Sequence, residues 1–332
     1  MMQEAIGRIS DIIANEDIFV ITSSLLLEPI RSSLPEIPPE NIIAEPAKRN
    51  TAPCLALASS IISARYSELN SDEILTAVLT ADHKIEPKEN FVEIINEAFN
   101  FVAENDALAT IGINPTRAET GYGYIELGEL QKGRISKVLS FREKPNSKSA
   151  EEYIHSGNFM WNSGMFFWKL STFNSEMLLR YPEIGKLIPE LTNLYKDCHS
   201  KILDGANESA QEVFERMPSI SIDYALMEKS PNVVCIKSDF NWDDVGSWDS
   251  LDRVRTADSD GNILSGNNLI LDSKNCIIIN ENSTNIKVTG IGLHDMVIIS
   301  TGDSIMICPK SKAQDVKLIV NKLRENGELE LL

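Results

Sequence analysis

The sequence is poor in cysteine and has no long apolar run. Its five cysteines are scattered over 332 residues and form no CxxC pair. An odd, dispersed set gives little support to a disulfide framework or a zinc site, and reduced thiols in a cytoplasm are the simpler interpretation. No apolar stretch approaches the roughly 20 residues that span a bilayer. The first residues also lack the basic flank and apolar core of a secretory signal. We therefore expect a cytoplasmic protein without a membrane partner.

Positive charge is also scarce. Asp and Glu number 49 against 31 Lys and Arg, which gives a formal net charge of -18. A surface of that sign repels phosphate backbones, so nucleic acid is not expected as a partner. An anionic small substrate would need local cations or a metal ion to bind. Hydrophobic residues at 42% and charged residues at 24% are ordinary for a globular protein, which excludes a disordered or fibrous chain.

The first 120 residues alternate between short apolar runs and helical patterns. Runs of strand type occur at 18–21, 41–44, 77–79 and 108–113. Between them, apolar residues from Phe91 to Val102 recur at the three-to-four spacing of a buried helix face. Another helix is predicted to begin at Thr51, whose side chain can cap the first turn. This alternation predicts an α/β fold, with a Rossmann-like, mostly parallel sheet in a three-layer domain.

The pattern changes along the rest of the chain. Two strands, at 124–127 and 135–141, are predicted to flank a polar turn, and the aromatic-rich segment 159–168 is predicted to be a buried strand. After residue 258, short β-type runs follow one another too closely for crossover helices, so this part is either a small sandwich or a β-helix. A helix over 316–323 closes it. We predict two domains, 1–258 and 259–332.

Two aspartates lie where an open parallel sheet binds its ligands, beyond the carboxyl ends of the strands. Asp82 follows the predicted strand at 77–79, and Asp244 lies near the end of the α/β region. Both could converge on one Mg²⁺, which prefers oxygen ligands and keeps several waters and substrate phosphates. For a lone aspartate, capping a turn is the simpler role, so position alone does not establish a metal site.

Seven short strings, taken together, resemble the bacterial mannose-1-phosphate guanylyltransferase family. In chain order they are EPAKRNTAP at 45–53, ADH at 81–83, GYGYI at 121–125, FREKP at 141–145, WNSGMF at 161–166, SIDY at 221–224 and WDDVGSW at 242–248. One string alone is a weak signal, whereas seven in the family's order are a strong one. The tail at 290–303 resembles the family's small left-handed β-helix domain. The resemblance runs from about residue 15 to the end of the sequence.

The resemblance implies a reaction. GTP and α-D-mannose 1-phosphate would give GDP-mannose and diphosphate, by in-line attack of a sugar-phosphate oxygen on the α-phosphorus of GTP. Such a protein aligns two polyanions and neutralises charge without a covalent intermediate. The catalytic residues implied are Lys144, Asp82 and Asp244, of which the two aspartates would hold Mg²⁺.

The resemblance also implies the residues that bind the substrates. Lys144 would meet the sugar phosphate as a point charge, and Glu143 would accept hydrogen bonds from sugar hydroxyls. Gly123 would let the backbone approach the hexose, and Asn162 would offer it both a donor and an acceptor. Those lining the nucleotide pocket would be Glu45, Arg49, Asn50 and Thr51.

The sequence departs from the family at one place. The family opens with a strand and a glycine-rich loop that cradles the triphosphate with backbone N–H groups. The printed sequence has no such loop, and residues 2–13, with four isoleucines on one helical face, look like the helix that follows it. About 30–40 residues of the pattern, including a central parallel strand, are therefore expected to be absent from the first domain.

A missing central strand would leave unpaired backbone edges and exposed apolar surface. Losing a single oxyanion-type donor costs about 10²–10³ in rate, and a whole set would be lost here. The chain as printed is therefore expected to have little or no guanylyltransferase activity alone. A misassigned start and a shortened chain remain alternative explanations.

Two further functions stay open. One is a non-catalytic regulatory or scaffold homologue that keeps the sugar pocket and the β-helix domain. The other is a nucleotidyltransferase for a different sugar 1-phosphate, because few residues contact the hexose. The β-helix region and the last helix offer surfaces for self-association, so a homodimer is the oligomer to test.

Overall fold

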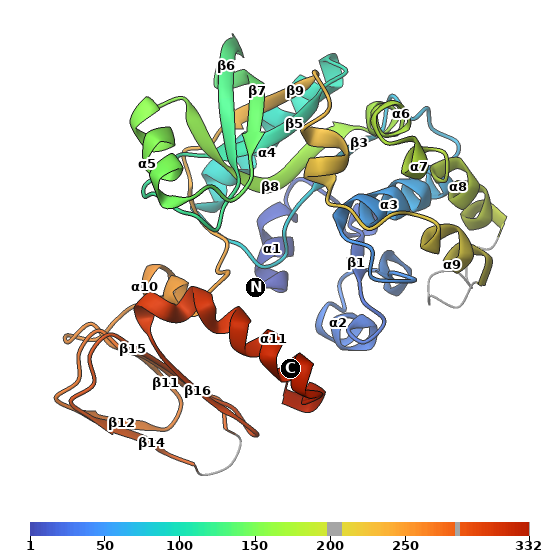
Figure 1. Cartoon of the computed structure of the whole chain (residues 1–332). Coiled ribbons are helices and arrows are strands. Elements are labelled where there is room, and N and C mark those ends of the chain that lie inside the picture. Colours follow the sequence, from blue (N-terminus) through green and yellow to red (C-terminus); the bar gives the residue numbers. More distant parts are fainter. Residues whose placement is uncertain (198–207, 283–285, 332) are drawn as a thin grey trace. The chain divides into compact units, whose positions relative to one another are not determined.

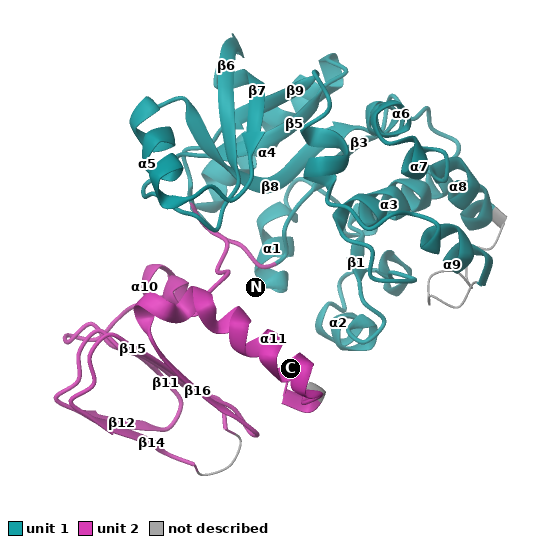
Figure 2. Ribbon diagram, in the orientation of Figure 1, with its two compact units in different colours: residues 1–81, 85–241 teal, residues 82–84, 242–332 magenta. Residues whose placement is uncertain are grey.

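The computed structural model describes residues 1–197, 208–282 and 286–331. The chain divides into two compact units, coloured separately in Figure 2. The first unit holds residues 1–81 and 85–241, and the second holds 82–84 and 242–332. The boundary predicted at residue 258 falls inside the second unit. Among the described helices, none has the length and the apolar character needed to cross a bilayer.

A six-stranded sheet forms the centre of the first unit, in the order β3-β8-β5-β9-β7-β6 (Figure 1). Its strands are β3 (Leu75–Val78), β5 (Leu108–Ile113), β6 (Tyr124–Lys132), β7 (Ile135–Arg142), β8 (Phe159–Lys169) and β9 (Val233–Lys237). β5 pairs parallel with β9 but antiparallel with β8. The sheet is therefore mixed rather than mostly parallel. One reason is the tight turn between β6 and β7, with Gly133 at φ 55°, which can join only antiparallel strands.

Helices flank these strands and bury their apolar faces. They are α1 (Met2–Ile9), α2 (Leu27–Ser33), α3 (Thr51–Arg65), α4 (Lys88–Glu104), α5 (Ser147–Ser156), α6 (Leu170–Arg180), α7 (Pro182–Gly185), α8 (Ile188–Asp197) and α9 (Glu208–Glu215). The predicted face of α4 is buried from Phe91 to Val102. The aromatic segment 159–168 is the buried strand β8, as predicted, and its Phe167 ring contacts Phe99 of α4 edge-on at 5.6 Å.

Two strands stand apart from the six-stranded sheet. β1 (Val20–Thr22) and β2 (Ile42–Ala44) pair in parallel, with Val20 opposite Ile42. All three residues of β2 are buried, whereas every residue of β1 is only half-buried. The same holds for β3, all of whose residues are half-buried, while β5 is buried along its whole length. β1 and β3 are thus less covered than comparable apolar strands of the same unit.

The second unit is built of short stacked rungs. Its strands are β11 (Ile263–Ser265), β12 (Asn268–Leu271), β13 (Ile277–Asn280), β14 (Val288–Ile291), β15 (Met296–Ser300) and β16 (Ile305–Pro309). β11, β13 and β15 pair in parallel, which stacks Ile263, Ile277 and Val297 in one buried column. Buried Asn262 donates to the Ser273 carbonyl at 2.9 Å and accepts from Cys276 N–H at 3.0 Å. The predicted β-helix-like domain is confirmed.

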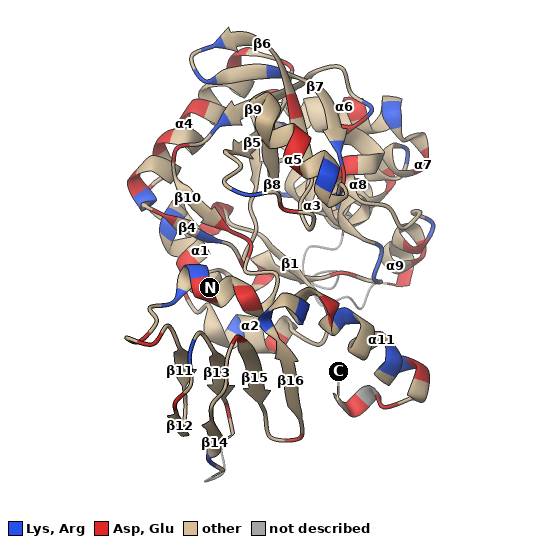
Figure 3. Cartoon of the chain, turned by 60° about the vertical axis from the view of Figure 1, so that its left-hand side comes forward, with Lys and Arg blue, Asp and Glu red and all other residues tan. Residues whose placement is uncertain are grey.

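Charge in the second unit lies outside the strands β11 to β16. The strands β11, β13, β15 and β16 contain no charged residue, whereas the helix α11 (Val316–Asn326), predicted over 316–323, carries both signs (Figure 3). A shorter helix, α10 (Leu251–Val254), precedes the rungs. Two short strands, β4 (Lys84–Glu86) and β10 (Asn241–Asp243), pair with each other.

Candidate functional site

Several residues of the quoted strings gather around Asn162 in the first unit. The Asn162 backbone N–H donates to the Gly123 carbonyl at 2.9 Å. A Cβ added to Gly123 would lie 2.7 Å from Glu143 Oε2 and 3.6 Å from Asn162 Cβ. A side chain at position 123 would therefore displace the Glu143 carboxylate. We call Gly123, Glu143, Lys144, Asn162 and Asp223 the Asn162 cluster.

The Asn162 side chain is held in one orientation. Its amide Nδ2 donates to Asp223 Oδ1 at 2.9 Å, and its Oδ1 accepts from Gly164 N–H at 3.2 Å. Because the donor and acceptor ends have different partners, the amide is fixed against rotation. An amide fixed in this way can present its second N–H in a constant direction, which suits recognition of a hydroxyl group.

The Asn162 cluster contains more negative than positive charge. Burial raises the pKa of Asp223, and the nearby Glu143 charge adds to this, while the Asn162 hydrogen bond and Lys144 act in the opposite direction. Burial also raises the pKa of Glu228, together with repulsion from Asp223 and Glu143. Lys144 Nζ lies 3.5 Å from Glu143 Oε1, and the lysine side chain is 65% exposed. The cluster therefore offers several acceptors for hydroxyl groups and one accessible cation for a phosphate.

Asp223 has no role in the sequence prediction, although it lies in the SIDY string. Its partner Asn162 is 61 positions away, and no local pattern connects the two. Asp223 begins a single π-helical turn, Asp223–Met227, and such turns occur frequently at functional sites. The one sequence signal for Asp223 was its place in SIDY, a string that resembles the family.

The start of α3 holds a second group of predicted residues. Asn50, at φ 72°, accepts the Thr51 N–H on its Oδ1 at 2.8 Å, so Asn50 is the cap. The prediction that Thr51 caps this helix is wrong, because Thr51 is already its first helical residue. Its Oγ1 instead accepts from Ile222 N–H at 2.8 Å. This bond ties the start of α3 to the segment that leads into Asp223.

Glu45 directly follows β2, in the loop that leads to α3. Its N–H donates to the Thr22 carbonyl at 2.7 Å. Burial raises the pKa of the Glu45 carboxyl, which the Cys54 thiol partly offsets by a hydrogen bond. Burial and the same carboxylate together raise the pKa of Cys54 well above its usual range, so this thiol stays protonated. Arg49, further along the loop, is half-buried.

The two aspartates predicted to hold a metal ion lie in the second unit. Asp82 is 80% exposed, and its Oδ1 lies 3.8 Å from His83 Nε2. His83 Nδ1 in turn accepts a hydrogen bond from Trp242 Nε1 at 3.0 Å. Asp244, two residues after Trp242, is half-buried and accepts Gly246 N–H at 3.2 Å. The His83–Trp242 contact thus joins the two segments that carry these aspartates.

The adjacent Asp243 has a different environment from Asp244. Its side chain is 8% exposed and forms an ion pair with Arg253, while its Oδ1 accepts Val245 N–H at 2.9 Å. Asp243 is thus engaged by protein groups. Over the part of the chain that the structure describes, no three side chains of metal-binding type gather. Mg²⁺ is commonly held by one or two carboxylates plus substrate phosphates, and the assignment of Asp82 and Asp244 to this ion stays a prediction.

The predicted site residues therefore fall into three groups. The first is Gly123, Glu143, Lys144 and Asn162, which lie together in the first unit. The second surrounds the start of α3, in the same unit, and is linked to the first through Thr51 and Ile222. The third is Asp82 and Asp244 in the second unit.

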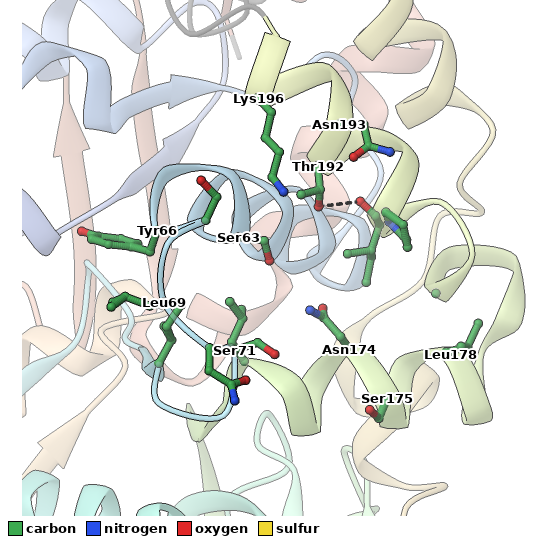
Figure 4. A pocket seen from close by; sticks show the side chains of 17 residues that line it. Ser63, Tyr66, Leu69, Ser71, Asn174, Ser175, Leu178, Thr192, Asn193 and Lys196 are labelled. Atoms are coloured by element: carbon green, nitrogen blue, oxygen red, sulfur yellow. Dashed lines mark hydrogen bonds between the residues drawn. The ribbon is translucent and has the colours of Figure 1, made fainter.

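A cavity of about 530 Å³ lies among α3, α6 and α8 (Figure 4). Hydroxyl and amide side chains, such as Ser63 and Asn174, line it together with apolar ones, such as Leu170 and Ile188. The Thr192 hydroxyl donates to the Ile188 carbonyl at 2.8 Å. None of the predicted site residues lines this cavity, so it is separate from the three groups above.

Comparison with known proteins identifies both parts of the chain. Residues 1–261 match the family "Nucleotidyl transferase", and residues 257–323 match the family "MannoseP isomerase/GMP-like beta-helix domain". A mannose-1-phosphate guanylyltransferase of Escherichia coli is 37% identical over 295 residues, which cover 87% of this chain and 61% of that protein. One of Salmonella muenchen is 35% identical over 341 residues, covering 99% of this chain and 67% of that protein.

Solved structures agree with these matches. A structure from Thermus thermophilus, described as a "mannose-1-phosphate geranyltransferase", covers 97% of this chain and 89% of its own, with a TM-score of 0.82 and 27% identity. A Helicobacter pylori structure described as a mannose-6-phosphate isomerase covers 73% of this chain and 89% of its own, with a TM-score of 0.56 and 22% identity, and shows likeness of fold alone. The chain spans about three fifths of the length of the Escherichia coli relative. By sequence and by fold, the chain belongs to the nucleotidyl transferase family, and its relatives there are mannose-1-phosphate guanylyltransferases.

Proposed function

We propose that this chain acts in guanylyl transfer, in which GTP and α-D-mannose 1-phosphate give GDP-mannose and diphosphate. The observation that carries the proposal is the Asn162 cluster. Its glycine, fixed amide, carboxylates and single exposed lysine suit a hexose phosphate. The names of the relatives support the same substrate class.

In this reaction a phosphate oxygen of the sugar attacks the α-phosphorus of GTP. One P–O bond forms, the bond to the β-phosphate oxygen breaks, and diphosphate leaves with the electron pair. Lys144 neutralises charge on the attacking phosphate, and Glu143 and Asn162 fix the sugar through its hydroxyl groups. The contribution of these residues is alignment and charge neutralisation, which need no covalent intermediate.

Magnesium dependence and a cytoplasmic location are part of this proposal. Asp82 and Asp244 would hold the Mg²⁺, and the ion would neutralise phosphate charge in a protein whose net charge is -18. The printed sequence lacks a glycine-rich loop. We therefore expect residues 1–332 to bind the sugar nucleotide with little or no turnover.

Calorimetric titration of residues 1–332 with GDP-mannose, in MgCl₂, tests the proposal. We expect saturable binding that weakens at least about tenfold, or ~1.4 kcal/mol, in Lys144→Met. A titration with GDP-glucose, and a panel of sugar 1-phosphates, tests the identity of the sugar. Absence of GDP-mannose binding, or equal binding by Lys144→Met, would overturn the proposal.

One alternative is a non-catalytic regulatory or scaffold homologue, because the printed residues contain no glycine-rich loop of their own. The two are separated by joining a strand and glycine-rich loop from a relative ahead of Met1 and measuring diphosphate release. Turnover in this chimera supports guanylyl transfer. Tight GDP-mannose binding without turnover supports the regulatory function.

A further inference from the structure

The Asn162 cluster takes its glycine from an irregular segment. Residues 114–123 join β5 to β6 and contain no helix or strand. Gly123 nevertheless has to stay in place, because its carbonyl accepts the Asn162 N–H at 2.9 Å and a Cβ there would displace the Glu143 carboxylate. Strand pairing between β6 and β8 holds the chain from Tyr124 onward. The segment before Gly123 therefore depends on side-chain hydrogen bonds for a fixed conformation.

Glu119 supplies these hydrogen bonds. Its Oε1 accepts the Thr120 N–H at 3.0 Å and the Gly121 N–H at 3.1 Å. Its backbone carbonyl accepts the Tyr124 hydroxyl at 2.9 Å. Hydrogen bonds to an ionised carboxylate are stronger than those between neutral groups. Glu119 thus fixes the chain on both sides of Gly123, with the two N–H groups before it and the tyrosine after it.

Arg117 holds the Glu119 side chain in turn. Its Nε donates to Glu119 Oε2 at 3.1 Å, so the two carboxylate oxygens have separate partners. Its Nη2 donates to the Tyr122 hydroxyl at 3.2 Å. The guanidinium carbon lies 5.0 Å from the centroid of the Trp161 ring, within the range of a cation–π contact. Because Trp161 directly precedes Asn162, Arg117 links the carboxylate of the segment to the strand that carries the amide.

Burial favours a supporting role for both charged residues. The Glu119 side chain is 18% exposed and that of Arg117 33%, while Tyr122 and Trp161 are buried. Each charged group already bonds to the other and to further protein groups, whereas Lys144 is 65% exposed. Arg117 and Glu119 therefore act on a ligand through the backbone that they hold, and not by direct contact.

We propose that Glu119, held by Arg117, is the positioning residue of the proposed hexose site. It fixes residues 119–123 so that Gly123 stays beside the Glu143 carboxylate before any sugar arrives. This role rests on the proposed function, because the site it serves is the one proposed to bind the sugar. A binding loop that is already ordered loses no further conformational freedom when the ligand binds, and affinity rises accordingly.

Amide hydrogen exchange, followed residue by residue with NMR, tests the positioning without a ligand. In Glu119→Ala the Thr120 and Gly121 N–H groups lose their acceptor, and we expect their exchange to be at least about fivefold faster, with no change in β5. Glu119→Gln keeps an oxygen for both N–H groups and should retain slow exchange. Glu129→Ala, which removes an exposed carboxylate of β6, is the matched control. Unchanged exchange in Glu119→Ala would contradict the proposed role.

Calorimetric titration in MgCl₂ separates the sugar from the nucleotide. In Glu119→Ala we expect the affinity for GDP-mannose to fall about tenfold, with the affinity for GDP unchanged because GDP has no hexose. A general loss of structure would weaken both ligands, and Glu119→Gln should bind GDP-mannose nearly as tightly as the parent. Equal losses for both ligands, or parental GDP-mannose affinity in Glu119→Ala, would overturn the proposal. Absence of GDP-mannose binding in the parent chain overturns the proposed function itself, and is seen before any variant is made.

Discussion

The Asn162 cluster and the acidic segments of the second unit are prepared for ligands to different degrees. In the cluster, the Asn162 amide is fixed by Asp223 and Gly164, and burial raises the pKa of the Asp223 carboxyl group. In the second unit, Asp82 is 80% exposed. Folding alone therefore preorganises the proposed sugar-binding site. The side chains of the proposed metal site become ordered only when a ligand binds there.

The largest effect should separate two neighbouring aspartates. We expect Asp243→Asn to lower the free energy of unfolding by about 3 kcal/mol, because it breaks a buried ion pair. The Arg253 side chain is 31% exposed, so this loss lies at the lower end of the range for buried ion pairs. Asp244→Asn should change unfolding by less than about 0.5 kcal/mol yet weaken Mg²⁺-dependent binding of GDP-mannose. Urea denaturation and calorimetry measure the two quantities. Equal unfolding free energies in the two variants would contradict this division of roles.

A second variant tests whether the proposed sugar-binding site is preformed. In Gly123→Ala the new Cβ would lie 2.7 Å from Glu143 Oε2, so the carboxylate must move. We expect GDP-mannose affinity to fall about tenfold, or ~1.4 kcal/mol, with the melting temperature nearly unchanged. Gly121→Ala is the matched control, since its Cβ would lie 3.4 Å from Glu119 Oε1. If both variants bind equally well, close approach at Gly123 is not required.

A third pair of variants concerns the cap of α3. Asn50→Ala removes the side-chain cap of α3 but keeps a Cβ at φ 72°, so the free energy of unfolding should fall by about 1 kcal/mol. Asn50→Gly also removes the cap but tolerates this φ, and should cost only a few tenths of a kcal/mol. Chemical denaturation of both variants gives the comparison. A larger loss in Asn50→Gly would show that the backbone conformation at position 50 is unimportant.

The smallest effect should appear in the pH dependence of stability. Below the unfolded-state pKa of about 3.9, Asp223 is neutral in both states and contributes nothing. As pH rises from there through the raised pKa of the folded state, the folded protein must ionise a buried carboxyl group, so its stability falls. The variant Asp223→Asn has no carboxyl group to ionise at this position, so its stability does not fall for this reason. Its stability relative to the parent should therefore increase with pH across that window, as measured by urea denaturation at several pH values.

The sequence predicts elements well where the signal is local. The strand at 108–113 and the aromatic strand that begins at Phe159 were placed correctly, because periodicity and apolar content lie within the segment itself. The mixed pairing of the six-stranded sheet was not predicted, since strand order depends on contacts between distant segments. The cap of α3 was placed one residue late, at Thr51, because Asn50 and Thr51 are both good capping residues.

The candidate site shows the same limit. The strings identified Gly123, Glu143 and Asn162, which lie together, although their roles remain predictions. No role was predicted for Asp223, because its partner Asn162 lies 61 positions away in the sequence. A pair of polar residues at that separation leaves no pattern in a single sequence.

The second unit is discontinuous in sequence, and this limits how the protein can be divided. Three of its residues, 82–84, are encoded inside the first unit. A fragment cut at residue 242 would leave Trp242 without His83, to which its indole N–H donates at 3.0 Å, and Val254 without the Lys84 ammonium. The polypeptide must therefore enter the second unit twice before that unit is complete. Its final assembly should wait until residues beyond Val254 have been synthesised, which couples the folding of the two units during translation.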